Sequence, residues 1–540
     1  MELQLIIDPG DVVDIANATL LSRQNEQDRL RYISRYVRGR HDPPFAPRGV
    51  NSEYRWIMKK SRRNFLPLVV DVISQNLHVD GWLPSGYTAN QVAAPQAPNP
   101  GWKTFRANRM VSRQHGIHRS VIKFGSAYCV VLPGQLATDE EQQAQDMPVI
   151  RPVSPRRMTA MYADDVDDEW PQFAIEVRAV NLPKGRTRVF VSVYDEVKRY
   201  ILASQVLSSI SSVGNYNLQM ADPADPLLNG QQIIAEHGLG ICPVIRFLYE
   251  TDLDGEDDCT GEIEPVIPIQ DQINFDTFNL MMSEQYAAIR QRWVTGMAPV
   301  DEQGREQAPF RPGVDRVWAA EDPNTHFGEF GETPLAPFSA VREDGIRHMA
   351  TVTQVPPYEL LGQIANMSAE ALAAAKDGQD RHVDELKSVL TDPWRNVFRL
   401  ESLARNDKDG WNDLFGTVQW RDTSTRSFSA TIDGLTKIAQ MLGVPVQELW
   451  KYIPGVTAED VQAWLLAAQR EQAQAVVEQA IAQAMQTPAA QLGQAIGTPN
   501  AAAVPGDGVV PAPPAPAPPG APAGAPIPPA PAGPGGKPPP

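Results

Sequence analysis

The stretch GEIEPVIPIQDQINFDTFNLMMSEQYAAIRQRW, residues 261–293, decides the architecture of this chain. Pro268 suits the first turn of a helix, where no backbone N–H donor is required. From there large apolar residues recur at steps of three and four, which is the spacing of one helical face. They are Phe275, Phe278, Met282, Tyr286, Ile289 and Trp293. We therefore expect a helix over 268–293, roughly 40 Å long at about 1.5 Å per residue, which needs an elongated surface to pack on.

The residues after this helix predict a small insertion and a second helix. Residues 294–336 are rich in Gly and Pro, and they suit two or three short strands. Helix returns at about 338–353, and Pro356 and Pro357 then stop it. Two helices that flank a small insertion predict a stalk with a knob at its tip.

The C-terminal part predicts long helices and then a tail. A helix is expected from about Ser368, with a bend at Pro393. Its apolar face consists of Leu372, Val383, Leu386, Leu390, Val397 and Leu400. Residues 430–485 are Ala/Gln-rich and predict further helix. Residues 486–540 hold 18 of the 49 prolines and only two charges, so we expect this tail to be disordered.

The first 250 residues predict an α+β region. Helices are expected over 11–39, from Ser52 onward with a kink at Pro67, and over about 102–123. Strands are expected over 126–132, 173–180 and 189–196, with the last two forming a hairpin. Because strand residues alternate between faces, Glu176 and Arg178 should point away from the apolar residues beside them.

Charge restricts the partners of the chain. Its net charge is −17, whereas a protein that grips DNA through phosphates needs a positive surface. One stretch differs, because residues 29–63 contain 11 Arg or Lys and only two acids. The alternatives for this stretch are a solvated face, salt bridges to an acidic neighbouring subunit, or a face toward DNA.

The cysteines and the hydropathy indicate a soluble chain that folds in a reducing cytoplasm. Cys129, Cys242 and Cys259 are far apart and odd in number, which supports neither a disulfide framework nor a zinc ribbon. The first residues lack the basic start and apolar run of a signal peptide. No uncharged apolar run reaches about 18 residues, so no membrane span is expected.

Catalytic motifs are not evident in the sequence. It contains no phosphate-binding GxxxxGK[ST] loop, no HExxH and no GxSxG. His115 and His118 could meet one metal, but no third ligand is evident. Residues 252–264 fail as an EF-hand, because Asp257 and Ile263 occupy its glycine and glutamate positions. Residues 164–169 are expected to form a solvated acidic loop. We expect no catalytic, cofactor-binding or metal-binding residue, and therefore no enzyme.

Three stretches together resemble the portal proteins of tailed double-stranded DNA phages, especially siphovirus-like actinobacteriophages. They are NFLPLVVDVISQNLHVDGW (64–82), the opening stretch 261–293, and TQVPPYELLGQIANMSAEAL (353–372). The third, with its VPPYELLG, is the most specific. The resemblance covers about residues 10–480, and it implies a portal fold: an α+β wing, a helical stem, a small β-rich clip, a long kinked helix and a helical crown.

The resemblance assigns a part to each segment. The wing would be residues 1–260, the stem 261–293 and 337–353, the clip 294–336, the tunnel loop 354–367, the long kinked helix with its return to the wing 368–429, and the crown 430–485. The tail 486–540 departs from any expected pattern and receives no role.

The resemblance also implies function and partners. The chain would form a dodecameric ring at one capsid vertex, through which the genome is packaged and later ejected. Its partners would be double-stranded DNA, the terminase large subunit, the head–tail connector, and the major capsid and scaffolding proteins. It would assemble in the host cytoplasm and end in the virion, without a membrane or a cofactor. The alternatives are a capsid-associated nuclease or protease, and a minor head or head–tail adaptor protein without its own conduit.

Three groups of residues are the candidate sites under this resemblance. The stem stripe 275–293 would meet neighbouring subunits. The tunnel-loop residues, expected to touch DNA, are Gln354, Tyr358, Glu359, Gln363 and Asn366. The clip residues, expected to dock the terminase and the connector, are Arg311, Arg316, Trp318, Phe327 and Phe330.

Overall fold

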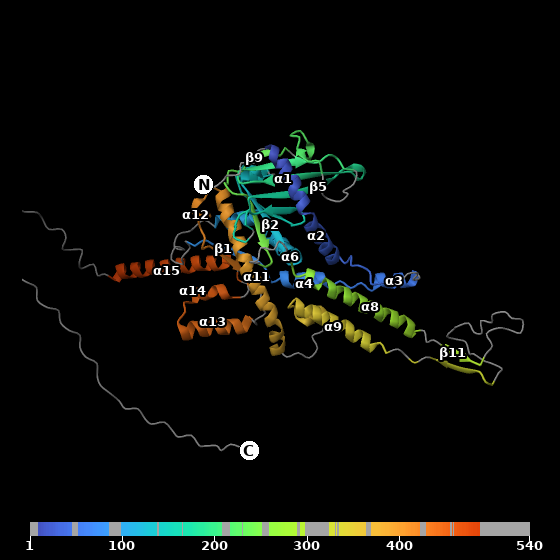
Figure 1. Cartoon of the computed structure of the whole chain (residues 1–540). Coiled ribbons are helices and arrows are strands. Elements are labelled where there is room, and N and C mark those ends of the chain that lie inside the picture. The colour runs from blue at the N-terminus through green and yellow to red at the C-terminus, as the bar shows by residue number, and fades with distance from the viewer. Residues whose placement is uncertain are drawn as a thin grey trace, which may run out of the picture. The chain divides into compact units, whose positions relative to one another are not determined.

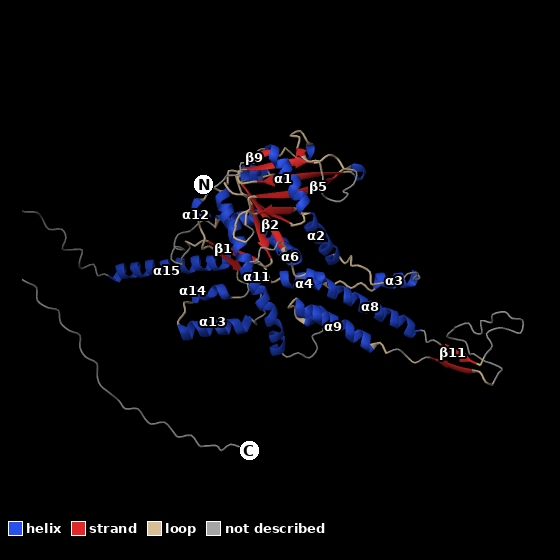
Figure 2. Cartoon of the chain, in the orientation of Figure 1, coloured by secondary structure: helices blue, strands red, loops and turns tan. Residues whose placement is uncertain are grey.

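The computed structural model describes residues 9–45, 52–85, 99–137, 140–164, 166–207, 216–228, 230–250, 259–288, 292–296, 323–329, 331, 334–362, 369–421, 428–453, 456 and 458–486. The chain has two compact units, residues 1–472 and 473–540. The elements described below lie in the first unit, except that α15 (Ala458–Gln486) continues past residue 472. The fold mixes helices and strands, as the sequence predicts (Figures 1 and 2).

Among the described residues, six helices precede the first long strand. They are α1 (Pro9–Ser22), α2 (Gln24–Val37), α3 (Ser52–Lys60), α4 (Leu66–Ser74), α5 (Pro100–Ala107) and α6 (Met110–Phe124). Each of the three helices expected here is divided in two. Pro67 lies in the first turn of α4 and therefore starts a new helix, where we expected a kink. Arg109 adopts a left-handed conformation between α5 and α6, which ends the first of these helices.

In the described part of the N-terminal half, strands form two antiparallel sheets. The smaller sheet has the order β10-β2-β3, with bounds Val244–Leu248, Ser126–Leu132 and Val149–Val153. The larger has the order β4-β5-β6-β7-β8, with bounds Met158–Met161, Phe173–Asn181, Thr187–Tyr194, Lys198–Ala203 and Gln219–Met220. Strand β9 (Ile234–Glu236) also pairs with β7. The strands expected at 126–132, 173–180 and 189–196 are therefore confirmed.

Strand β5 buries a charged residue, Glu176, on the face that also carries Ala174. Its carboxylate is buried, because Arg151 of β3 and Arg157 from the turn before β4 both bind it. Burial opposes ionisation, but the two guanidiniums outweigh it and hold the pKa of Glu176 below its usual range. The alternation predicted which face of β5 carries Glu176 but not its burial, because both partners arrive from another part of the chain.

The largest hydrophobic core surrounds α11 (Ala369–Ala404). This helix continues through Pro393, and the next residue, Trp394, is fully buried. The apolar face predicted for it is confirmed at Val383, Leu386, Leu390, Val397 and Leu400, which are all buried. After α12 (Lys408–Trp411), strand β13 (Thr417–Trp420) pairs with β1 (Val79–Leu83) and so joins the end of α11 to the N-terminal half.

Further helices lie between residues 428 and 486. They are α13 (Phe428–Leu442), α14 (Val446–Leu449) and α15 (Ala458–Gln486). Trp450 and Trp464 contact edge to face, which links the segment after α14 to α15. The helical prediction for residues 430–485 is confirmed, and the tail after Gln486 lies outside the described residues.

Candidate functional site: the paired helices and the segments around them

Two adjacent helices carry most of the candidate site. Helix α8 (Ile267–Ala288) follows a short 3-10 turn (Glu264–Val266), and α9 (Ala336–Val352) returns beside it (Figure 1). Gly345 on α9 lies against Ile273 on α8, and a Cβ atom there would come within 3.0 Å of Ile273 Cγ1. The absence of a side chain at position 345 therefore allows the two helices to approach closely.

Polar side chains clamp the first turns of α8. Gln270 and Asn274 lie four residues apart and are almost fully buried. The Gln270 amide accepts the Phe65 N–H at 3.0 Å and donates to the Arg63 carbonyl at 2.6 Å. Asn274 accepts the Arg63 N–H at 2.9 Å, and its Nδ2 lies 2.9 Å from the ring of His41. These bonds provide hydrogen-bond partners for the non-helical backbone of residues 63–65 and fix α8 against that segment.

The lead-in to α8 is tied to the core by charged groups. Arg29 on α2 pairs with Glu264 at 2.8 Å, which is a partly exposed contact. Farther inside, Glu262 accepts the hydroxyl of Tyr249, and that hydroxyl lies 3.1 Å from the ring nitrogen of His382 on α11. Burial and the adjacent Glu262 carboxylate raise the pKa of Tyr249, so its hydroxyl stays protonated. Residues of three separate segments thus hold the start of α8.

The apolar stripe on α8 meets two environments. Phe278 is buried within the chain, where its ring contacts Tyr54 edge to face at 4.8 Å, and Met282 packs beside it. Helix α3 provides this cover through Ile57 and Met58. Phe275 is 44% exposed. The subunit-interface role predicted for the stripe therefore depends on Phe275 and on residues farther along, because the chain's own α3 covers Phe278.

The far end of the stripe differs from the expectation. Helix α8 ends at Ala288, and Trp293 lies on strand β11 (Arg292–Thr295). The expectation that the helix reaches Trp293 is wrong, because the backbone has changed to strand there. The side chain of Tyr286 and all of Ile289 lie outside the described residues.

A two-stranded hairpin follows the paired helices. Strand β11 pairs antiparallel with β12 (His326–Glu329), and the Trp293 ring lies over Gly328, where a side chain would require the ring to move. Trp293 and Phe327 are 39% and 40% exposed. The other predicted docking residues, Arg311, Arg316, Trp318 and Phe330, lie outside the described residues.

The proline-punctuated segment is partly helical. Gln354 adopts a left-handed backbone, and Pro357 then begins the short helix α10 (Pro357–Leu361). Val355 and Leu360 are buried and anchor this helix, whereas Gln354 and Glu359 are exposed and Tyr358 is half-buried. The loop expected over 354–367 therefore contains a helical turn, which begins at Pro357 because proline suits a first turn. Gln363 and Asn366 lie outside the described residues.

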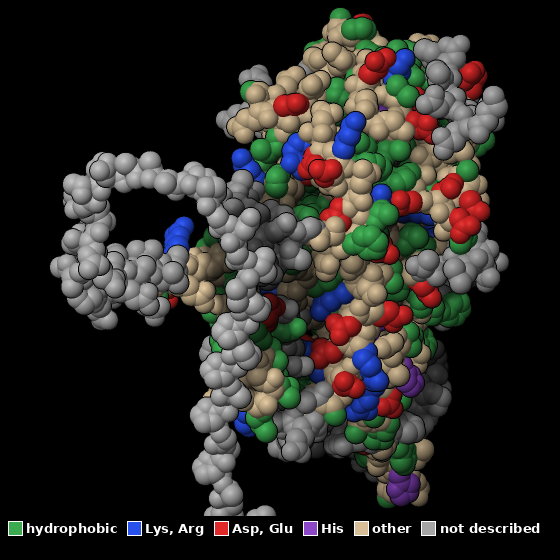
Figure 3. All heavy atoms as spheres, turned by 90° about the vertical axis from the view of Figure 1, so that its left-hand side faces the viewer, with side chains coloured by type: hydrophobic (Ala, Val, Ile, Leu, Met, Phe, Trp, Pro, Cys, Tyr) green, Lys and Arg blue, Asp and Glu red, His purple; other side chains and the backbone are tan. Residues whose placement is uncertain are grey.

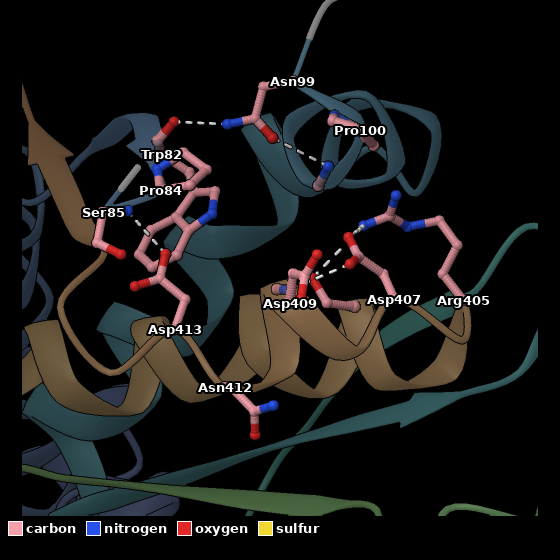
Figure 4. Close-up of a pocket in the computed structure, with 13 residues that line it drawn as sticks. Trp82, Pro84, Ser85, Asn99, Pro100, Arg405, Asp407, Asp409, Asn412 and Asp413 are labelled. Atoms are coloured by element: carbon pink, nitrogen blue, oxygen red, sulfur yellow. Dashed lines mark hydrogen bonds and ion pairs between the residues drawn. The ribbon is translucent and has the colours of Figure 1, made fainter. Parts of the chain in front are cut away.

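A polar cleft of about 480 Å³ lies between β1, α5 and α12 (Figure 4). Two of its carboxylates, Asp407 and Asp413, have structural partners. Asp413 accepts the Ser85 N–H at 2.8 Å, and Asp407 accepts the Gly410 N–H at 3.1 Å and pairs with Arg405. Such groups stabilise turns and helix starts, and the Ser85 side chain and backbone both bond to Asp413.

The two histidines considered as metal ligands serve different purposes. His118 is fully buried, donates to the Leu77 carbonyl at 3.0 Å and accepts the Trp394 indole N–H at 3.1 Å. Both ring nitrogens are therefore occupied. His115 instead lies near His78, with the ring centroids 5.2 Å apart and the rings tilted by 35°. Within the part of the chain that the structure describes, no group of three or more His, Cys, Asp or Glu could hold a metal ion.

The hydrogen bonds of Gln270 and Asn274 and the close helix contact at Gly345 were not predicted from the sequence. Gln270 and Asn274 repeat at a spacing of four among apolar residues, and that spacing was the available signal for a buried polar row. Nothing in the sequence identifies their partners, because residues 63–65 lie about two hundred positions away. Gly345 has no local signal beyond being a glycine inside a helix.

Comparison with known proteins supplies the remaining evidence. A family model described as "Phage portal protein, SPP1 Gp6-like" matches residues 22–475, which include the paired helices, the hairpin and α11. No curated protein matches the chain. Among the described residues, no helix has both the length and the apolar content needed to cross a membrane.

Proposed function

The chain belongs to the SPP1 Gp6-like family of phage portal proteins, and from this premise we propose how its parts act in a DNA conduit. Membership implies an oligomeric connector through which DNA passes, in a component of the virion. The family is structural rather than enzymatic, and the match does not favour the alternative of an adaptor without its own conduit.

We propose that α8 and α9 form the stem and that the β11–β12 hairpin belongs to the clip. The observation that carries this proposal is the close pair of helices, with Gly345 against Ile273, and the small hairpin inserted between them in sequence. The polar clamp at Gln270 and Asn274 fixes the base of this pair. A rigid base suits a wall that must stay in place while DNA moves past it.

The other segments take the remaining parts in this proposal. Residues 1–260 form the wing, 354–367 the tunnel loop at the channel, 368–429 the long helix behind it, and 430–485 the crown. Residues 354–367 contain no Lys or Arg, and Glu359 is their only charge. A nearly uncharged loop can touch moving DNA without the phosphate contacts that would trap it.

The partners follow from the position of the clip. At the far end of the stem, the hairpin would dock the terminase large subunit during packaging and the head–tail connector afterwards. The exposed aromatic residues Trp293 and Phe327 support this placement, since aromatic side chains are frequent anchors of interfaces. The wing would contact the capsid and scaffolding proteins, and assembly would occur in the host cytoplasm.

Native mass spectrometry of the purified full-length chain tests the proposed ring. A closed ring predicts one dominant assembly of about twelve copies, because a heterologous contact that closes on itself fixes the copy number. A monomer or a ladder of open oligomers at every concentration would contradict the proposal.

A further inference from the structure

The basic stretch found in the sequence contributes to a cluster that the portal role does not use. The cluster consists of Arg31, Arg38, Arg119, Lys123 and Arg156, and is called here the α2–α6 basic cluster. Arg31 and Arg38 are seven residues apart on or just after α2, and Arg119 and Lys123 are four apart on α6. Because such spacings place residues on one helical face and α2 packs against α6, the two pairs come together.

Arg156 completes the cluster from another part of the chain. Its guanidinium donates to the Ser34 hydroxyl of α2 at 3.3 Å, and its Nε is buried without a partner. Lys123 is half-buried, and its ammonium lies over the Phe124 ring. Helices α2 and α6 and the turn before β4 thus place their positively charged side chains close together.

Negative charge at the cluster is scarce. Arg119 pairs with Asp71 and Arg31 pairs with Asp28 at 2.9 Å. Within the described ranges, Arg38, Lys123 and Arg156 have no carboxylate partner. Burial and the guanidiniums of Arg119 and Arg38 lower the pKa of Lys123 although the Asp71 carboxylate acts in the opposite direction, and burial together with Arg38 and Arg31 lowers that of Arg156. The repulsion between these positive charges therefore destabilises the isolated subunit, and a bound anionic group would reduce that repulsion.

We propose that an acidic surface of a neighbouring copy of this chain covers the α2–α6 basic cluster in the ring. The inference rests on the proposed function, because it requires neighbouring copies. Net charge favours this occupant, since chains of −17 repel one another and need local opposite charges to associate. The same net charge disfavours DNA at this place. On the face drawn in Figure 3, acidic and basic side chains are interspersed.

The position of the cluster agrees with a contact between subunits. The carbonyl of Ile122, next to Lys123, accepts the Glu262 N–H at 2.9 Å in the lead-in to α8. Arg29 on α2 pairs with Glu264 in the same lead-in. The cluster therefore adjoins the base of the helix that we assign to the ring wall.

The test compares two double variants of the full-length chain. Arg38→Gln with Lys123→Gln removes two charges from the cluster, and Lys184→Gln with Arg186→Gln removes two from the exposed β5–β6 turn. Mass photometry over a dilution series measures the concentration at which half of the chains are in rings. The cluster variant should need at least about tenfold more protein than wild type, which is the effect of losing one favourable charge pair. The control variant should match wild type, and salt at about 0.5 M should weaken wild-type assembly most.

A second readout separates assembly from folding. Lys123→Gln should raise the melting temperature of the unassembled chain, because it removes a half-buried charge from among like charges, while it still weakens ring formation. If the double variant folds poorly, the single variant Arg38→Gln is used in its place, because Arg38 is exposed and its loss should not affect folding.

Wild-type assembly by the cluster variant would overturn the inference and leave the proposed function intact. Unchanged assembly with lost retention of DNA fragments would identify nucleic acid as the occupant instead. A wild-type chain that forms no ring would contradict both proposals.

Discussion

The Asn274 amide on α8 accepts the backbone N–H of Arg63 at 2.9 Å. This bond connects residues that are 211 positions apart in the sequence. With the two bonds of Gln270, it replaces the hydrogen bonds that residues 63–65 would make in a helix. The segment 63–65 and the first turns of α8 are therefore joined by buried polar contacts in addition to apolar packing.

Loss of this clamp should destabilise the chain. Gln270→Leu leaves the Phe65 N–H and the Arg63 carbonyl without partners in a buried place, at a cost of about 1–3 kcal/mol for each group. Urea unfolding measures the change. The control is Gln272→Leu, at an exposed position two residues on, which should change the unfolding free energy by less than about 0.5 kcal/mol. Equal effects of the two substitutions would show that the clamp contributes nothing.

The helix pair should not tolerate a side chain at position 345. Gly345→Val would push against Ile273, and overpacking of this kind costs about 1–3 kcal/mol. Ile273→Ala should recover part of that loss in the double variant, as a double-mutant cycle would show. Gly116→Ala is the control, because open space surrounds that helical position and alanine should stabilise it. Additive effects at 345 and 273 would argue against the contact.

Substitution of Phe275 on α8 should affect ring assembly, whereas substitution of Phe278 should affect the stability of the subunit. Phe275→Asp places a charge at an exposed position, so we expect a normally folded subunit that forms fewer rings. Phe278→Ala removes a ring buried against Tyr54, so it should destabilise the subunit itself by about 3–5 kcal/mol. Circular dichroism melts and native mass spectra distinguish the two outcomes. Full ring formation by the Phe275 variant would remove that residue from the subunit interface.

Stability should depend on pH through His118. Burial lowers the pKa of its ring from 6.5 to about 3. The unfolded chain therefore binds a proton that the folded chain does not bind in this range. Its contribution to stability is present above pH 6.5 and is lost as the pH falls toward 3, by up to about 1.4 kcal/mol per pH unit. His118→Gln should be less stable at neutral pH but should lose stability more slowly on acidification. Parallel urea-unfolding curves for the two proteins from neutral pH to pH 5 would contradict this account.

Charge in the tunnel loop should impair DNA passage. Gln363→Lys with Asn366→Lys adds two cations to a segment that has none, and each can bind a phosphate of the moving duplex. We expect normal rings with reduced genome packaging or ejection, measured as packaged DNA and infectivity. Gln363→Asn with Asn366→Gln is the matched control, because it keeps the segment uncharged. Normal infectivity of the lysine variant would place these residues away from the channel.

Local periodicity was enough to locate most elements of the fold. The strands at 126–132, 173–180 and 189–196 and the buried face of α11 follow from side-chain spacing alone, and the structure contains them. Helix ends were less predictable. Pro67 and Pro357 each begin a helix, because proline is accepted in a first turn as readily as it stops a helix elsewhere.

Contacts between distant segments account for what the sequence did not reveal. Glu176 is a charged residue in an alternating strand, and only the arrival of Arg151 and Arg157 explains its burial. Phe278 belongs to a helical stripe whose cover could equally be another subunit or the same chain. Its contact with Tyr54, more than two hundred residues earlier, decides this. The predicted roles of the tunnel loop and the clip stay predictions.

The measurement that tests the central claim most directly is a set of negative-stain class averages of the purified full-length chain. A portal ring predicts top views of a closed circle with a stain-filled centre and about twelve lobes. It also predicts side views with a narrow stem below a broader wing. Compact single particles, open arcs or discs without a central channel would contradict the account.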